Sequence, residues 1–204
     1  MNPHSPPRKS TELVSAFLIF LATVAYIWLA AARAPWLVVV PAGLVVLHWY
    51  RRRETVDSLG LRWKDFVRSF RSWRVVWIAC IVVFIAFGWT KVAHAEMIGR
   101  GAVYFCWCAI QQLIYQSVTY RPIRDAMKSP WMAAPIAGIA FAAVHAPNPV
   151  LMAGTLAWGV LSSLLFERCR SIWGLAALQV MLSSMLLWAT PYSLNRGFRI
   201  GPFY

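Results

Sequence analysis

The stretch CAIQQLIYQSVTY, residues 108–120, places three amide side chains, Gln111, Gln112 and Gln116, inside an otherwise apolar run. An amide that leaves water costs free energy unless it finds a hydrogen-bond partner, whereas leucine carries no such cost. The three amides therefore indicate a polar interior within an apolar helix bundle. The rest of the sequence shows what kind of bundle this is.

The composition indicates a membrane protein. The 204 residues are 60% hydrophobic, include 12 Trp and have a mean hydropathy of +0.57. A soluble domain of this length cannot bury so much apolar surface, so lipid must solvate part of it. The net charge of +13 does not indicate a nucleic-acid partner, because the cations lie between apolar runs and not on one basic module. We expect membrane lipids as partners and no nucleic acid.

Seven apolar segments predict an all-α fold, a polytopic transmembrane helix bundle with about seven spans, or eight as the alternative. A bilayer-spanning helix needs about 20 residues, and the second and fifth segments are shorter than that. The segments are 13–32, 36–50, 75–92, 102–120, 131–145, 149–166 and 172–189.

The chain is expected to divide into three parts: N-terminal spans with a basic segment in 1–100, core spans in 101–190, and a short tail in 191–204. The first apolar segment ends in Ala30-Ala31-Ala32, which resembles a signal-peptide cleavage region. Its apolar stretch is too long for a signal peptide, so we expect an uncleaved span.

The distribution of cations predicts the orientation. With the N-terminus inside, 15 of the 20 Lys and Arg residues lie on the inner side and 5 on the outer side. Cytoplasmic loops carry the excess of Lys and Arg, so we expect a cytoplasmic N-terminus. The outer five are Arg33, Lys91, Arg100, Arg196 and Arg199.

The segment 58–74, SLGLRWKDFVRSFRSWR, predicts an amphipathic helix on the inner membrane surface. Its apolar residues recur at helical spacing, and its cations take the other side, where they would face anionic head groups. The apolar stripe is Leu59, Trp63, Phe66, Phe70 and Trp73, and the cations are Arg62, Lys64, Arg68 and Arg71. An ordinary basic loop is the alternative.

The four cysteines predict neither a disulfide framework nor a metal site. Cys106 and Cys108 are not a CxxC pair, and a zinc site would need further ligands nearby. We expect no metal and no other cofactor.

Polar residues recur on three of the expected spans. Gln112 and Gln116 lie four residues apart and share a helix face, and so do Gln179 and Ser183. The fifth apolar segment ends in FAAVHAPNP, which contains His145 and Asn148, and Asn148 precedes a proline suited to a helix start. Such groups can act as interhelical hydrogen bonds worth about 0.6–2 kcal/mol, or they can converge on a site.

These residues fall at the motif positions of a known family. Residues 102–187 resemble the CAAX-protease and bacteriocin-processing family of glutamic intramembrane proteases, which carries EExxxR, then FxxxH, then HxxxN or HxxxD. Gln111, Gln112 and Gln116 stand at the first motif. Phe141 to His145 fits the second, and Gln179 and Ser183 stand at the third.

The resemblance implies catalytic positions at His145, Gln111, Gln112 and Gln179. Gln116, Asn148 and Ser183 are expected to contact a substrate. Only His145 keeps the family's residue, since amides replace both glutamates. An amide cannot act as a useful general base. No acid replaces it within an apolar segment; the acids are Glu12, Glu54, Asp57, Asp65, Glu96, Asp125 and, at a segment edge, Glu167.

Three functions follow from this pattern. The first is a catalytically degenerate member that binds a membrane segment or a protein partner. The second is an active endopeptidase in which His145 is the base and Gln179 and Gln112 polarise the carbonyl. The third is a small-molecule transporter. The sequence shows no intramembrane charge pair and no inverted repeat, and this argues against a transporter.

The small size of the chain and the usual location of members of this family favour a bacterial plasma membrane.

Overall fold

The computed structural model describes residues 9–88 and 95–203, and within these ranges the regular structure is entirely helical. The elements are α1 Lys9–Ala25, η1 Tyr26–Ala30, η2 Pro35–Val38, α2 Val39–Arg52, α3 Trp63–Ser72, α4 Arg74–Gly88, α5 Ala95–Ile114, η3 Tyr115–Tyr120, α6 Arg121–Met127, α7 Pro130–Ala143, α8 Pro149–Arg168, α9 Ile172–Ala189, α10 Tyr192–Asn195, η4 Arg196–Phe198 and η5 Gly201–Phe203.

Each predicted apolar segment is helical over nearly all of its described length, which confirms the all-α class; residues 31–32 and 144–145 are turns, and residues 89–92 of the third segment lie outside the described ranges. Among the described residues, three helices are long and apolar enough to cross a membrane: Ser10–Ala30, Pro149–Arg168 and Ile172–Ala189. The pair α3 and α4 makes a fourth if it counts as one broken span. The chain is therefore an integral membrane protein, and about seven spans remains a prediction.

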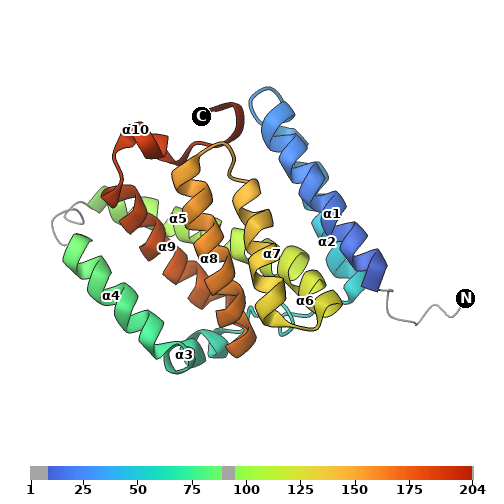
Figure 1. The fold of residues 1–204 in the computed structure, drawn as a ribbon, viewed down its shortest axis with the longest axis horizontal. Helices are drawn as coiled ribbons and strands as arrows, with labels where there is room; N and C mark the ends of the chain where they lie inside the picture. Colours follow the sequence, from blue (N-terminus) through green and yellow to red (C-terminus); the bar gives the residue numbers. More distant parts are fainter. Residues whose placement is uncertain (1–8, 89–94, 204) are drawn as a thin grey trace, which may run out of the picture.

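The bundle has two distinct ends (Figure 1). The turn between α1 and α2, the turn between α7 and α8 and the C-terminal segment lie at one end. Helix α3, the connection from α6 to α7 and the turn between α8 and α9 lie at the other. Helix α5 crosses behind α8 and α9, and the pair α1 and α2 flanks the bundle on the opposite side from α4.

Helices α7 and α8 approach each other closely because glycines face each other. A Cβ on Gly159 would lie 2.9 Å from the Gly138 Cα and 3.2 Å from the Tyr115 hydroxyl oxygen. A Cβ on Gly138 would lie 3.1 Å from the Leu156 carbonyl oxygen. Small residues allow such backbone contact between membrane helices. This contact holds together the two helices that carry His145 and Trp158.

Gly159→Ala should destabilise the protein by about 1–3 kcal/mol, because the new methyl group meets backbone that cannot move aside cheaply. Thermal unfolding of the purified protein in detergent micelles measures the change. Gly43→Ala in α2 is the matched control, since nothing lies within 4 Å of its Cβ position. The control should be neutral or stabilising by roughly 0.5–1 kcal/mol. Equal effects of both variants would contradict the close-contact argument.

The predicted amphipathic helix is present as α3, which meets α4 at 86°. Its expected apolar stripe divides in two. Trp73 is 2% exposed and Phe66 packs against Trp77, whereas Trp63 is exposed and Phe70 stacks on Trp77 while 43% of it stays exposed. Leu59 precedes the helix. One apolar side therefore anchors α3 to the bundle, and the other is available to lipid, as expected of a helix in the membrane interface.

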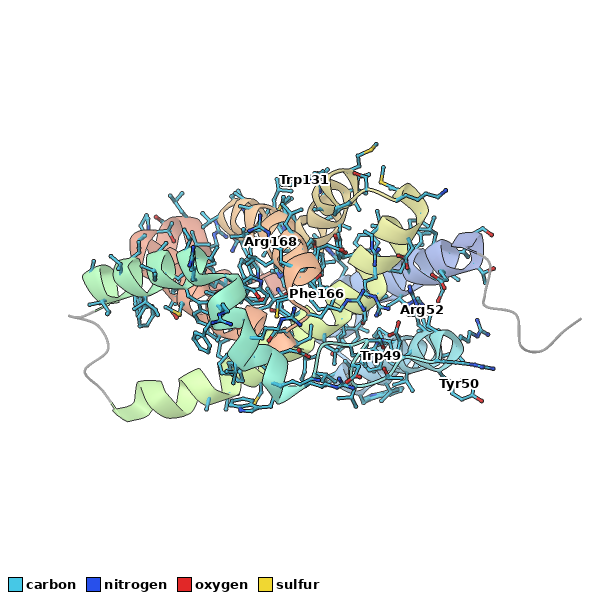
Figure 2. All side chains as sticks on the ribbon, turned by 90° about the horizontal axis from the view of Figure 1, so that it is seen from below. Trp49, Tyr50, Arg52, Trp131, Phe166 and Arg168 are labelled. Atoms are coloured by element: carbon cyan, nitrogen blue, oxygen red, sulfur yellow. The ribbon has the colours of Figure 1, made fainter. Side chains whose placement is uncertain are left out.

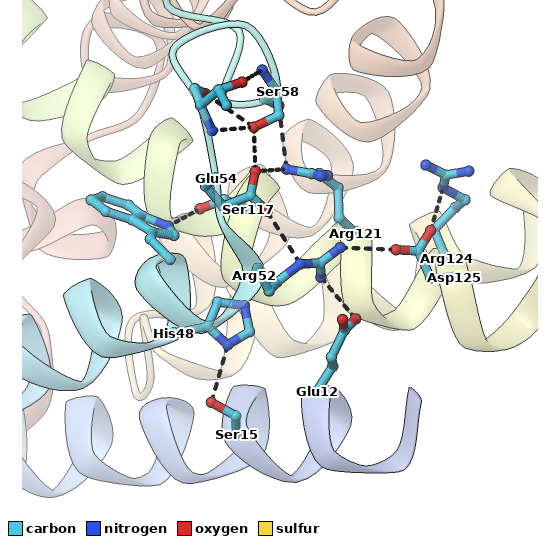
Figure 3. A network of polar contacts seen from close by, with 12 residues as sticks. Glu12, Ser15, His48, Arg52, Glu54, Ser58, Ser117, Arg121, Arg124 and Asp125 are labelled. Carbon is cyan, nitrogen blue, oxygen red and sulfur yellow. Dashed lines mark hydrogen bonds and ion pairs between the residues drawn. The ribbon is translucent and has the colours of Figure 1, made fainter. Parts of the chain in front are cut away.

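A network of charges holds α1, α2 and α6 together at the α3 end (Figure 3). The Arg52 guanidinium, whose side chain is 9% exposed, lies 3.1 Å from Glu12, 3.1 Å from Glu54 and 3.0 Å from Asp125. Arg121 donates to Glu54 at 2.9 Å. Three carboxylates from separate parts of the chain therefore share the Arg52 guanidinium.

The same network reaches α8 through Arg124 and Glu167. Arg124 lies 3.4 Å from Asp125 and 3.2 Å from Glu167, and Tyr120 donates to Glu167 at 3.1 Å. Figure 2, viewed from below, shows Arg52 at this end, with Tyr50 on the outer surface. Four acidic residues, Glu12, Glu54, Asp125 and Glu167, are thus partners in this one ion-pair network.

Arg52→Met should cost about 3 kcal/mol of stability, because it leaves half-buried carboxylates without their shared cation. Arg51→Met, one residue earlier on the same helix and exposed, should change stability by less than about 0.5 kcal/mol. Midpoints of thermal unfolding compare the two. An Arg52→Met midpoint within error of the wild type would show that the network contributes nothing.

Candidate functional site

A cavity of about 530 Å³ lies between α5, α8 and α9 and extends to the C-terminal segment. Most of its surface is apolar, with aromatic walls from Trp107 and Phe198. A few polar groups converge on it. They are Tyr104, Gln111, His145, Thr155, Trp158, Gln179 and Ser183. A concave apolar site with a small number of polar groups is the usual form of a ligand site.

Four glutamines form a head-to-tail chain of amides across α5 and α9. Gln116 Nε2 donates to Gln112 Oε1 at 3.1 Å, and Gln112 Nε2 donates to Gln179 Oε1 at 2.7 Å. Gln179 Nε2 then donates to Gln111 Oε1 at 2.8 Å. The direction of each amide follows from this network. The chain ends at the cavity, where no described residue accepts a hydrogen bond from Gln111 Nε2.

The inner part of this chain is closed off from the cavity. Gln112 and Gln116 are both 0% exposed, and neither lines the cavity. Trp158 Nε1 also donates to Gln179 Oε1, at 3.0 Å, so that oxygen accepts two hydrogen bonds. Gln116 Nε2 has a second contact with Ser162 Oγ at 3.3 Å. Buried networks of this kind fix the rotamers of their members.

His145 follows the end of α7 and presents one ring nitrogen to the cavity. Its Nδ1 lies 2.7 Å from the Phe141 carbonyl oxygen, which can only accept a hydrogen bond, so the proton sits on Nδ1. Nε2 therefore carries a lone pair. The Phe141 ring meets the imidazole edge to face with a centroid separation of 4.9 Å, which fixes the ring orientation.

Asn148 lies outside the cavity lining and is fully buried. Its Oδ1 caps α8 by accepting from Leu151 N at 3.0 Å. Its Nδ2 donates to the carbonyl oxygens of Asn195 at 2.8 Å and Arg199 at 3.2 Å. Asn148 thus fastens the C-terminal segment, and its expected contact with a substrate remains a prediction.

The structure brings four of the seven predicted site residues to one cavity: His145, Gln111, Gln179 and Ser183. Their roles in binding or catalysis remain predictions.

No Asp or Glu from the described part of the chain lines this cavity. Within the same residues, no group of three His, Cys, Asp or Glu could hold a metal ion.

Three lining features were not anticipated from the sequence. Tyr104 lies seven residues before Gln111, and this two-turn spacing on α5 could have placed it on the same face. Trp158 bonds the amide chain, and Phe198 and Ile200 come from the C-terminal segment. No local pattern in the sequence marked Trp158, Phe198 or Ile200 as cavity residues.

The fold and the cavity define a helical integral membrane protein with an internal, amide-lined site. Residues 101–185 match the family model described as Rce1-like, type II CAAX prenyl endopeptidase, which confirms the resemblance indicated by the three motifs. The matched region contains the whole glutamine chain and His145. No curated protein and no solved structure matches the chain.

Gln112→Leu should destabilise the protein by about 1–3 kcal/mol, because it removes a partner from both Gln116 and Gln179 in a buried setting. Gln111→Leu removes an acceptor only from Gln179, at the cavity, and should cost less. Thermal unfolding in detergent tests both. A larger loss for Gln111→Leu than for Gln112→Leu would contradict the buried amide chain.

Proposed function

We propose that this protein is a non-hydrolytic relative of the CAAX-type intramembrane proteases and that it binds a membrane-embedded peptide segment in the cavity. One observation supports this most directly. Amides occupy the carboxylate positions and hydrogen-bond one another, and the final amide, Gln111, has its Nε2 free to donate into the cavity.

The absence of a carboxylate base argues against hydrolysis. A positioned base contributes typically about 10²–10⁴ in rate, and glutamine cannot take a proton from water at neutral pH. Glu167 lies on α8, one of the cavity helices, but it is bound to Arg124 and Tyr120 at the other end of the bundle. None of the described acids faces the cavity.

The polar groups of the cavity match the needs of a peptide backbone in lipid. Inside a bilayer every backbone N–H and C=O needs a partner, and a non-helical stretch lacks its own. Gln111 Nε2 is a donor for a carbonyl, and His145 Nε2 is an acceptor for an N–H. The apolar walls suit the side chains of such a segment. A prenyl chain, named in the family's description, is the second ligand to test.

An active endopeptidase is the alternative that a specific observation favours. The Phe141 carbonyl orients His145 and leaves Nε2 free to accept a proton. Gln179 is available to polarise a carbonyl, but Gln112 is fully buried behind it. The expected contribution of Gln112 is therefore indirect in this alternative.

We also propose that the α3 end of the bundle faces the cytoplasm of a bacterial plasma membrane, with the N-terminus on that side. The described cations support this orientation, since those of α3, α6 and the turn between α8 and α9 gather at that end (Figure 1). A cytoplasmic leaflet would be the anionic one.

The hydrolysis test uses the full chain in lipid nanodiscs with a fluorogenic membrane-spanning peptide. The wild type should cleave no faster than His145→Ala. Gln111→Glu keeps the acceptor for Gln179 Nε2 and returns a carboxylate to the cavity, so it is the variant that should gain turnover. Wild-type cleavage that His145→Ala abolishes would overturn the proposal in favour of the active peptidase.

The binding test places a photoreactive residue at Leu161, which lines the cavity, and at Ile78, which is 61% exposed on α4, as the control. The probes are a synthetic apolar peptide of about 20 residues with a central Gly-Pro break and a prenylated peptide. The broken peptide should cross-link at Leu161 and not at Ile78. Ala157→Trp, which fills the cavity, should suppress it. Equal cross-linking at both positions would indicate nonspecific lipid-phase contact.

A further inference from the structure

A second recess, of about 540 Å³, lies at the opposite end of the bundle from the amide-lined cavity, between α3 and the turn that joins α8 to α9. Charged side chains dominate its lining. Five cations face three carboxylates there, which leaves an excess of two positive charges. The cations are Arg62, Lys64, Arg68, Arg168 and Arg170, and the carboxylates are Asp57, Asp65 and Glu167.

The walls of this recess are fixed by buried hydrogen bonds. Ile172 N donates to the Gly60 carbonyl at 3.0 Å, and Trp173 Nε1 donates to the Leu61 carbonyl at 2.8 Å. Gly60 has φ +74, and a Cβ there would lie 3.0 Å from the Arg170 carbonyl oxygen. Trp73 Nε1 ties the far end of α3 to the Leu165 carbonyl at 3.0 Å. The backbone segments from which the cations project are therefore held in place by contacts within the protein.

Two of the three carboxylates are already engaged. Asp57 contacts Arg62, and Glu167 is held by Arg124 and Tyr120. Lys64, Arg68, Arg168 and Arg170 are exposed and have no carboxylate partner among the described residues. The third carboxylate, Asp65, also lines the recess and offsets one of these four charges, which leaves an excess of positive charge. Arginines favour phosphate because the guanidinium fork matches its oxygens.

An exposed apolar stripe runs beside these cations. Trp63, Val67 and Phe70 are 67%, 58% and 43% exposed and lie on one face of α3. Lys64 comes directly after Trp63 in the sequence, and Arg68 directly after Val67. Consecutive residues of an α-helix lie about 100° apart around its axis, so the cations lie beside the stripe. A ligand that satisfies both surfaces carries an anionic group and an apolar chain side by side.

We propose that this recess binds the phosphate head group of an anionic phospholipid, whose acyl chains lie along Trp63, Val67 and Phe70. Arg168 and Arg170 come from the turn between α8 and α9, and Lys64 and Arg68 from α3, so the lipid bridges the two elements. Arg168 lies at the end of α8 in the view from below (Figure 2). This inference does not depend on the function of the amide-lined cavity.

The test uses native mass spectrometry of the full chain in detergent with added phosphatidylglycerol, and phosphatidylcholine for comparison. The wild type should retain one phosphatidylglycerol in preference to phosphatidylcholine. The double variant R168Q/R170Q should lose that affinity by at least about tenfold, since each cation near an anionic lipid surface contributes substantially. R51Q/R53Q removes the same charge at the same end of the molecule, outside the recess, and should change affinity by less than about threefold. Thermal midpoints confirm that each variant is folded.

Two results would overturn the proposal. Equal losses for the two double variants would mean that the preference is a diffuse effect of net charge. Displacement of the lipid by millimolar inorganic phosphate or glycerophosphate would mean that the recess takes a soluble phosphate and that the apolar stripe plays no part. Trp63→Ser in the wild-type background separates the contributions further, because it should weaken phosphatidylglycerol binding while leaving all cations in place.

Discussion

The core of this protein depends on the need of buried amides for hydrogen-bond partners. Gln112 and Gln116 have no exposed surface, and each unpaired group there would cost about 1–3 kcal/mol. The amide chain meets that need for every amide group of these two side chains except Gln116 Oε1, by linking side chains of α5, η3 and α9, with Trp158 joining from α8. The same bonds that position the three helices also determine which polar atoms reach the cavity. The same hydrogen-bond network therefore supports the helix packing and shapes the site.

The two ends of the bundle solve different electrostatic problems. At the α3 end, Arg52 and Arg121 neutralise carboxylates within the protein, while the cations beside α3 remain exposed to a membrane surface. At the other end, Asn148 satisfies carbonyls of the C-terminal segment with a neutral amide. Ion pairs thus serve at the α3 end, and a neutral amide serves in the buried contact with the C-terminal segment. Both arrangements avoid an unpaired charge in a buried setting, which would carry a high cost.

Periodicity and composition predicted the helices well, because membrane-spanning segments must satisfy their own backbone. The i, i+4 spacing of Gln112 and Gln116 also predicted their shared face, and the structure joins them directly. What the sequence could not provide was which polar residues face the cavity. Asn148 looks like a site residue by position, yet its bonds go to the tail, whose contacts depend on long-range packing. Trp158 and the ion pairs of Arg52 are likewise products of tertiary structure, for which local patterns carry no signal.

The geometry also explains why glutamine can stand where a carboxylate pair would otherwise lie. Glutamine is close to glutamate in size, but it both donates and accepts. At Gln111 only the acceptor is used within the protein, since Gln179 donates to it. At Gln112 both functions are used, because it accepts from Gln116 and donates to Gln179 Oε1. A carboxylate in place of the Gln111 amide could still accept the hydrogen bond from Gln179 Nε2. A carboxylate in place of the Gln112 amide would put an oxygen next to Gln179 Oε1, and neither oxygen could donate a hydrogen bond. The chain of amides is thus a neutral arrangement that leaves only Gln116 Oε1 without a partner among its buried atoms, and it preserves the cavity without any group that must ionise.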